Sequence, residues 1–245
     1  YNLKTIFKEI VKSTYFRAKS YSTEDEAKLL EVSELGMGRL LTPEQLDKKI
    51  TSVTGQRWAD NDGDPFLLEE NEYLILYGGI DSDDVTVRIT EPNGIMSGIQ
   101  YRMANEMACD TVARDFTNPP EQRRYFPSVE PGFVPVTPEG LAVTEAEAAI
   151  KENIQYLHWH ILGERLELDD PEIERTYGVW LGTWQEGFPQ IETLGEGLGP
   201  CGADEDIFGN ELPEEDRLTS DPDYSIRAWM AVVTYLLADY KFLYE

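Results

Sequence analysis

Apolar residues recur at spacings of three and four through much of the chain, which is the period of an α-helix with one buried face. The stretch from about residue 95 is rich in methionine, which is more typical of a core than of a copper or haem site. The last stretch begins near residue 222 and is apolar on nearly every side, so we expect it at the centre of the core. The repeating positions are Met96, Ile99, Met103, Met107 and Val112 in the first, and Ile226, Trp229, Met230, Val233, Leu236, Leu237 and Tyr240 in the last.

Two further helices carry boundary signals. Thr42 precedes Pro43 and Gln45, which is the arrangement of a capping box, and Gly55 follows as a natural stop. Residues 170–171 read Asp-Pro, which is a typical helix start, and they are followed by apolar residues at helical spacing. We therefore expect one helix between the first two signals and another after the Asp-Pro pair.

The remaining chain predicts little sheet. Segments 73–79 ("YLILYGG") and 85–90 ("VTVRIT") have the composition of short strands, and the turn between them would make a hairpin. Residues 117–139 and 189–221 are rich in Pro, Gly and acidic residues and are expected to be long loops. The predicted fold is therefore mainly α, a compact helical domain over 1–245 with one short β-hairpin, long Pro/Gly-rich acidic loops and a sub-boundary near 117–139.

Charge excludes two classes of function. Acidic residues outnumber basic ones by 47 to 21, which gives a net charge of −26. Such a chain would be repelled by nucleic acid and by anionic lipid. The longest uncharged run near the C-terminus, residues 228–238, is too short to span a bilayer. The exception to the acidity is an amphipathic stretch, residues 3–16, which we expect to pack on the acidic remainder of the chain or on a preceding domain.

His158 and His160 are the two histidines of the chain, in the segment "YLHWHILG". On a helix, side chains two residues apart point roughly 200° from each other, so these imidazoles cannot chelate one ion together. We expect His158 to be part-buried and hydrogen-bonded, and His160 to face solvent or a partner. No C-x-x-C-H motif occurs, so the chain has no attachment site for a c-type haem of its own.

Asp60, Asp62 and Asp64 alternate in "WADNDGDPFLLEE", and Glu69 follows them. Calcium prefers such closely spaced oxygen ligands, so these four residues are candidate calcium ligands. The loop differs from an EF-hand because Pro65 stands where that loop needs glycine. The alternative is an acidic turn without metal.

Cys109 and Cys201 are the two cysteines, the first in a helical pattern and the second in an acidic Gly/Pro loop. A disulfide between them would tie the loop to the helices. Two free buried thiols in a cytosolic protein are an equally good interpretation of the residues alone.

Four segments together resemble the C-terminal part of large, uncharacterised exported bacterial proteins related to the planctomycete-type cytochrome c group. The resemblance implies that the chain is the C-terminal portion of a longer exported chain, with a periplasmic or extracellular location and a disulfide between Cys109 and Cys201. It also implies a place beside an electron-carrying module, where His158 and His160 would be candidate ligands to a haem of a partner. The segments are "RLLTPEQL" (39–46), "LYGGIDSDDVTVRITEPNG" (76–94), "RMANEMAC" (102–109) and "DYSIRAWMAVVTYLLADYKFLYE" (223–245).

Three functions compete at this point. The first is a non-catalytic extracytoplasmic scaffold or docking module of a c-type cytochrome or a similar redox assembly, and it agrees with the absence of P-loop, G-x-S-x-G and H-E-x-x-H motifs. The second is an exported hydrolase that acts on a polymer through paired carboxylates, which would need two such groups in one cleft. The third is a calcium-stabilised adhesion or filament subunit, which would melt earlier in a chelator.

Overall fold

The structure is a computed structural model, and the chain in it divides into two units, Tyr1–Leu40 with Tyr244–Glu245, and Leu41–Leu243. Of the first unit it describes mainly one helix, and of the second nearly all residues. The described residues are 3–13, 38–69, 71–81, 84–136, 143–206 and 209–244.

The first unit contains α1 (Leu3–Lys12), a strongly amphipathic helix. It confirms the helix predicted from residue 3, whereas the rest of that prediction, residues 14–16, lies outside the described residues. None of the ten residues of α1 is buried, and Leu3 and Phe7 are 67% and 66% exposed.

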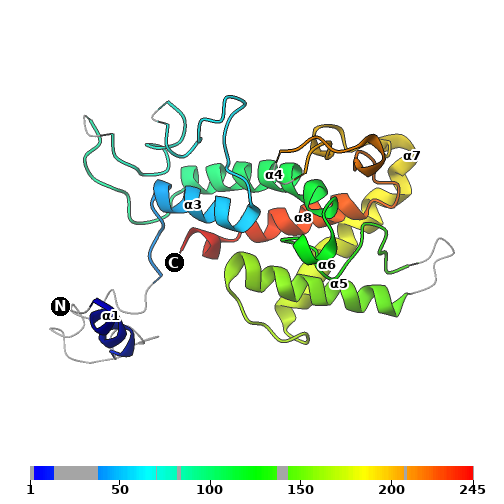
Figure 1. Cartoon of the computed structure of the whole chain (residues 1–245), viewed down its shortest axis with the longest axis horizontal. Coiled ribbons are helices and arrows are strands. Elements are labelled where there is room, and N and C mark those ends of the chain that lie inside the picture. The colour runs from blue at the N-terminus through cyan, green and yellow to red at the C-terminus, as the bar shows by residue number, and fades with distance from the viewer. Residues whose placement is uncertain are drawn as a thin grey trace. The chain divides into compact units, whose positions relative to one another are not determined.

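The second unit is helical, and its core lies around α8, which packs against both α4 and α6 (Figure 1). The apolar residues predicted to make α8 central are buried, among them Trp229 and Leu236 at 0% exposure. Among the residues that the structure describes, no helix is long and apolar enough to cross a membrane. The helices are α3 (Pro43–Thr54), α4 (Gly94–Phe116), α5 (Thr144–Leu157), the π-helix η2 (His158–Leu162), α6 (Pro171–Gly187), α7 (Ile191–Leu194) and α8 (Ser225–Leu237), with short 3₁₀ turns η1 (Pro120–Gln122), η3 (Phe188–Gln190), η4 (Gly199–Cys201), η5 (Glu214–Asp216) and η6 (Tyr240–Leu243).

Two predicted helix starts are confirmed, those of α3 and α6. Gln45 N–H donates to the Thr42 hydroxyl and the Gln45 side chain accepts from Thr42 N–H, which is the predicted capping box, and Gly55 ends α3 at φ 83°. The Asp170 carboxylate likewise caps α6 by accepting from Glu172 N–H at 2.9 Å. These contacts satisfy backbone donors that the first turn of a helix leaves unpaired.

The start of α8 differs from the prediction. The helix begins at Ser225 rather than near residue 222, and Tyr224 before it has φ 57°, in the left-handed region. Its first N–H groups are held from outside, because the buried Asp221 carboxylate accepts from Ile226 N–H (3.1 Å) and Arg227 N–H (3.0 Å). Asp221 therefore does the work that a local cap does in α3 and α6.

The predicted β-hairpin is wrong, because the described residues contain no strand. The first predicted strand instead winds into turns, in which Tyr77 N–H donates to the Tyr73 carbonyl at 2.8 Å. This conformation buries Tyr77 and stacks the Tyr73 ring on Trp58, with centroids 5.4 Å apart. Aromatic packing outweighs the strand propensity of the segment, which is a weak and context-dependent preference.

The first Pro-rich loop is anchored rather than lying loosely on the surface. The carboxylate of the buried Asp115 accepts three backbone N–H groups, from Arg124 at 2.7 Å, Tyr125 at 2.9 Å and Phe126 at 3.2 Å. Phe126 is fully buried and stacks on Phe116 with ring centroids 4.1 Å apart. The described part of this loop, up to residue 136, lies inside the second unit and packs into its core.

The second loop is also folded. Three isolated antiparallel bridges join its two legs, at Gly197–Ser220, Ala203–Leu218 and Glu205–Glu211. Ala203 is fully buried between the legs. The two legs therefore pair with each other, and the described residues of this loop place Cys201 against α4.

Candidate functional site

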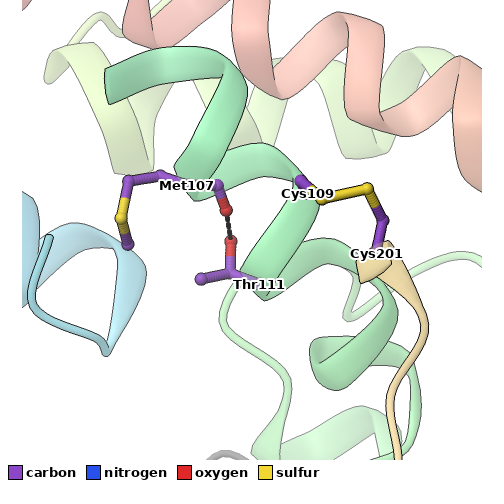
Figure 2. The surroundings of a disulfide bond; sticks show 4 residues. All are labelled: Met107, Cys109, Thr111 and Cys201. Carbon is purple, nitrogen blue, oxygen red and sulfur yellow. Dashed lines mark hydrogen bonds between the residues drawn. A yellow bond between two sulfur atoms is a disulfide. The ribbon is translucent and has the colours of Figure 1, made fainter. Parts of the chain in front are cut away.

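Cys109 on α4 and Cys201 on η4 form a disulfide, with sulfurs 2.02 Å apart and Cα atoms 4.5 Å apart (Figure 2). The pairing implied by the resemblance is therefore present. It closes a loop of 92 residues, for which chain entropy predicts a stabilisation of about 4 to 5 kcal/mol. Met107 points to the other side of α4, so the disulfide lies on the outer side of the helix (Figure 2).

The disulfide forms part of the wall of an open groove between α4 and α8, which we call the α4–α8 groove. Its volume is about 700 Å³. Small side chains line it on both helices, Ala108 on α4 and Ala231 on α8 among them, while Tyr101, Met230 and Asp239 supply larger groups. A surface of this kind, mostly apolar and open along two helices, is typical of a site that binds another helix.

A second hollow of about 470 Å³, the Trp58 hollow, lies on the other side of Asn105 and Cys109, which line both. Trp58 Nε1 donates to Glu106 at 2.7 Å, and Arg102 pairs with the same carboxylate at 2.7 Å. Asp60 and Asp110 also line this hollow and carry no ion pair with Arg102.

Asp110 lines the Trp58 hollow together with a second acidic residue, Glu106. Desolvation raises the pKa of its carboxyl, and Glu106 adds to the rise while Arg114 opposes it. When two carboxyl groups lie close together, a nearby cation stabilises their charged forms. The Trp58 hollow therefore extends the α4–α8 groove toward a region of negative charge.

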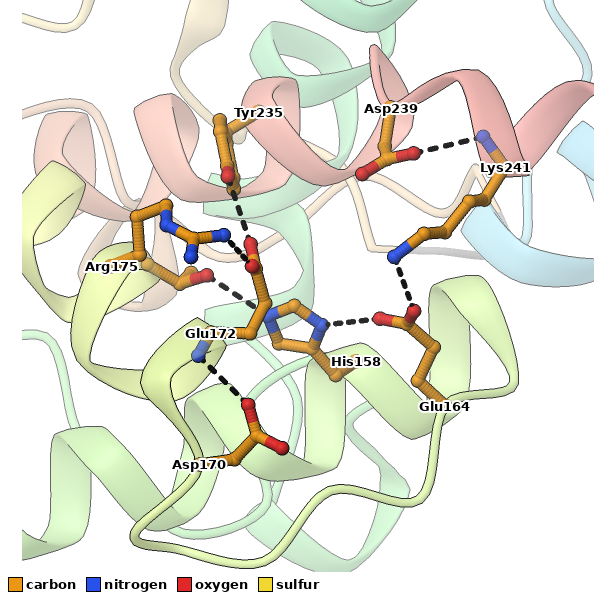
Figure 3. A network of polar contacts seen from close by, with 9 residues as sticks. His158, Glu164, Asp170, Glu172, Arg175, Tyr235, Asp239 and Lys241 are labelled. Carbon is orange, nitrogen blue, oxygen red and sulfur yellow. Dashed lines mark hydrogen bonds and ion pairs between the residues drawn. The ribbon is translucent and has the colours of Figure 1, made fainter.

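His158 lies in a closed polar network at the end of α5 (Figure 3). Its Nδ1 is 2.9 Å from Glu164 Oε2, and its Nε2 is 2.9 Å from the Thr176 hydroxyl. Because a carboxylate only accepts, Nδ1–H donates to Glu164, and in the neutral imidazole Nε2 accepts from Thr176. Lys241 Nζ then donates to Glu164 Oε1 at 2.6 Å. The prediction of a hydrogen-bonded His158 is confirmed, and at 1% exposure the residue is buried more fully than the part-buried position that we expect from the sequence.

Glu164 is the charged centre of the network. Burial would raise the pKa of its carboxyl, but the hydrogen bonds from Lys241 and His158, together with the charge of Lys241, outweigh this and hold the pKa below its usual value. The carboxylate therefore stays ionised and ties the turn after η2 to the C-terminal residues of the unit.

The order Thr176, His158, Glu164 matches the connectivity of a nucleophile, a base and an orienting acid. Access decides against that use, because Thr176 is 0% and His158 1% exposed, so no substrate reaches the hydroxyl. The same closure bears on haem ligation, since both ring nitrogens of His158 already have partners. The His158 network therefore has a structural role.

His160 points elsewhere, as the spacing predicts for a pair that cannot share one ion. Its Nε2–H donates to the Val53 carbonyl at 2.9 Å, and its ring stacks on Tyr156 with centroids 5.6 Å apart. It also meets the edge of Tyr125 at 5.9 Å. The residue is half-buried between α3 and the aromatic rings rather than turned to solvent.

The candidate calcium residues lie on an exposed turn. Asp60 Oδ1 accepts from the N–H groups of Asp62 and Asp64, both at 2.9 Å. Glu69 is exposed beyond the turn. Within the described ranges no group of three or more His, Cys, Asp or Glu side chains is placed to hold a metal. The calcium site stays a prediction.

Sequence reasoning did not identify Asp115, Asp221, Glu164 or Thr176. Each acts on a partner outside its own helical turn. Asp115 and Asp221 accept from backbone N–H groups that have no sequence signature, and Glu164 and Thr176 contact the His158 side chain. Comparison with known proteins adds nothing to the assignment, because no family model, curated protein or solved structure matches the chain.

Proposed function

We propose that this chain is a non-catalytic scaffold or docking module of an exported protein assembly. The observation that carries the proposal is the contrast between an open, apolar groove between α4 and α8 and a closed His158 network. The groove offers open and mostly apolar binding area, whereas the network holds its hydroxyl and imidazole out of reach of a substrate.

A c-type cytochrome or similar redox protein is the partner that the sequence resemblance favours. In that arrangement the haem belongs to the partner, and this chain contributes a surface. The location would be periplasmic or extracellular, where the disulfide between Cys109 and Cys201 is stable.

A reduced-minus-oxidised visible spectrum of the natively purified particle tests this partner. The expected result is sharp c-type bands at a fixed ratio of haem to this chain. A blank spectrum from an intact particle would remove the cytochrome and leave a docking module with another partner. Substrate turnover by a chain whose groove is blocked by Ala231→Arg would show catalysis at another place in the chain. That result would contradict the non-catalytic proposal itself.

A further inference from the structure

A further hollow, which we call the Trp159 hollow, lies between the end of α5 and the turn that follows η2. Its volume is about 470 Å³, and small-molecule sites range from about 300 to 1,000 Å³. Four side chains at helical spacing line one wall, and residues 164–166 line the other. All of them belong to the second unit, so that unit alone forms the hollow. The four are Glu152, Gln155, Tyr156 and Trp159.

Two aromatic rings form an accessible surface in this hollow. Trp159 is 49% exposed, whereas the other four tryptophans of the chain are buried. Tyr156 lies beside it, with ring centroids 5.8 Å apart, and is held in place by stacking on His160 at 5.6 Å. Trp159 belongs to the π-helix η2, a rare element that often occurs at functional sites. An indole left open beside a second ring offers a flat, mostly apolar face to a ligand.

Hydrogen bonds hold the opposite wall in place. Gln155 Nε2 donates to the Leu166 carbonyl at 2.7 Å, which fixes the turn to α5. Glu164, which also lines the hollow, is held by His158 and Lys241 (Figure 3). Walls that are already fixed lose little conformational freedom when a ligand binds. The buried His158 network therefore supports an open hollow on its outer side.

Two charged side chains at the hollow are available to a ligand. Glu152 and Arg165 line it, and neither forms a hydrogen bond or an ion pair with another residue that the structure describes. The carboxylate only accepts hydrogen bonds, and the guanidinium only donates them, from several N–H groups in one plane. A ligand that satisfies both must donate and accept, which hydroxyl groups do.

Together these features favour an uncharged sugar. A pyranose ring carries C–H groups on its faces, which pack against the negative face of an indole, and hydroxyl groups around its edge. An anionic ligand is disfavoured by Glu152 and Glu164 and by the net charge of −26, and a cationic ligand by Arg165. A wholly apolar ligand would displace water from Glu152 and Arg165 without replacing its hydrogen bonds.

We infer that the Trp159 hollow binds a neutral pyranose, either free or as one unit of a polysaccharide. The sugar ring stacks on Trp159, and its hydroxyl groups bond to Glu152 and Arg165. This function goes beyond protein docking, because the hollow lies on α5 and η2 rather than between α4 and α8. A chain with both sites attaches to a sugar through one surface and to a protein partner through the other.

Calorimetric titration of the full chain with cellohexaose, xylohexaose and mannohexaose tests the inference. At least one of these neutral chains is expected to bind, with the same affinity in low and high salt because the ligand carries no charge. Glucose, xylose and mannose, titrated in parallel, distinguish the two sources. Equal affinity for the monosaccharide identifies a free sugar as the ligand, and tighter binding of the hexasaccharide identifies a polysaccharide.

Variants then assign the binding to the hollow. Trp159→Ala is expected to weaken it at least about tenfold, because the stacking surface is lost. Arg165→Gln, at an exposed position where the fold is unaffected, should weaken it about tenfold through the loss of charged hydrogen bonds. Tyr101→Ala is the matched control, because Tyr101 is an exposed aromatic residue of the α4–α8 groove, and it should leave sugar binding unchanged.

Three results would overturn the inference. The first is that none of the neutral sugars binds. The second is binding that both Trp159→Ala and Arg165→Gln leave unchanged. The third is binding of polygalacturonate alone that is lost in high salt, since charge rather than stacking would then select the ligand. A blank haem spectrum bears on the α4–α8 groove and its partner and leaves this inference standing.

Discussion

The His158 network and the α4–α8 groove differ in what they make available. The network brings together a hydroxyl, an imidazole and a carboxylate with catalytic connectivity, but the first two are almost wholly buried. The groove is open and mostly apolar, with alanines, a methionine, tyrosines, Asp239 and the disulfide in its lining. Connectivity of catalytic groups is thus a poor guide to function without access, and here the accessible surface is one suited to binding.

Removing the disulfide changes the α4–α8 groove, the open region of this comparison, and should have the largest effect. Cys109→Ala with Cys201→Ala should lower the free energy of unfolding by about 4 kcal/mol, because the closed loop is long. It should also weaken docking, since Cys201 leaves the wall of the groove. Chemical denaturation and sedimentation measure the two effects. Reduction of the wild type should reproduce both, and an unchanged denaturation midpoint would contradict the structural role.

Disrupting the His158 network, the closed region, should reduce stability and leave docking intact. His158→Ala should lower the free energy of unfolding by about 3 kcal/mol, because it opens a buried space, removes the partner of the Thr176 hydroxyl and leaves Glu164 with Lys241 alone. Thr176→Val is the milder control, with a loss of about 1 kcal/mol. Thermal melting checks both, and a loss of partner binding at a temperature where His158→Ala is folded would show that the two regions are not independent.

The network should also respond to acid. The folded-state pKa of Glu164 lies below its unfolded value, so its ionised form stabilises the fold above the unfolded pKa of about 4.3. That stabilisation is lost as the pH falls through the folded-state pKa. Lys241→Met should therefore flatten the acid side of the stability curve, by less than about 1 kcal/mol since Lys241 is partly exposed. Denaturation between pH 3 and 7 measures the change, and identical curves would contradict it.

The features that can be predicted from the sequence are those that depend on neighbouring residues. The caps at Thr42 and Asp170 depend on residues within one helical turn, so the sequence predicts them. The hairpin prediction fails because Trp58 and Tyr77, fixed by tertiary packing, decide the path of the segment. Asp115 is equally hidden from sequence reasoning, since its partners lie nine to eleven residues away on the backbone.

The sites divide in the same way. His158 could be predicted as a part-buried, hydrogen-bonded residue from its place beside the apolar stripe of α5, but its full burial and its partners on other elements could not. The disulfide followed from a resemblance rather than from spacing. The groove had no sequence signal, because it arises only where α4 and α8 meet.

Calcium should have the smallest effect. Asp60 already accepts two backbone N–H groups, which closes the acidic turn without metal. Excess EDTA is therefore expected to leave the melting temperature unchanged. A rise of several degrees on adding calcium, reversed by EDTA and abolished by Asp62→Asn with Asp64→Asn, would establish the calcium site and overturn this expectation.

Native mass measurement of the wild type, Ala231→Arg and Thr176→Val tests most directly whether the groove, rather than the network, is the working surface. The account predicts that Ala231→Arg purifies without the partner that the wild type carries in its native particle, while its melting temperature stays within about a degree or two of the wild type. Thr176→Val should keep the partner and melt earlier. A partner that stays bound to Ala231→Arg and is lost from folded Thr176→Val would contradict the account.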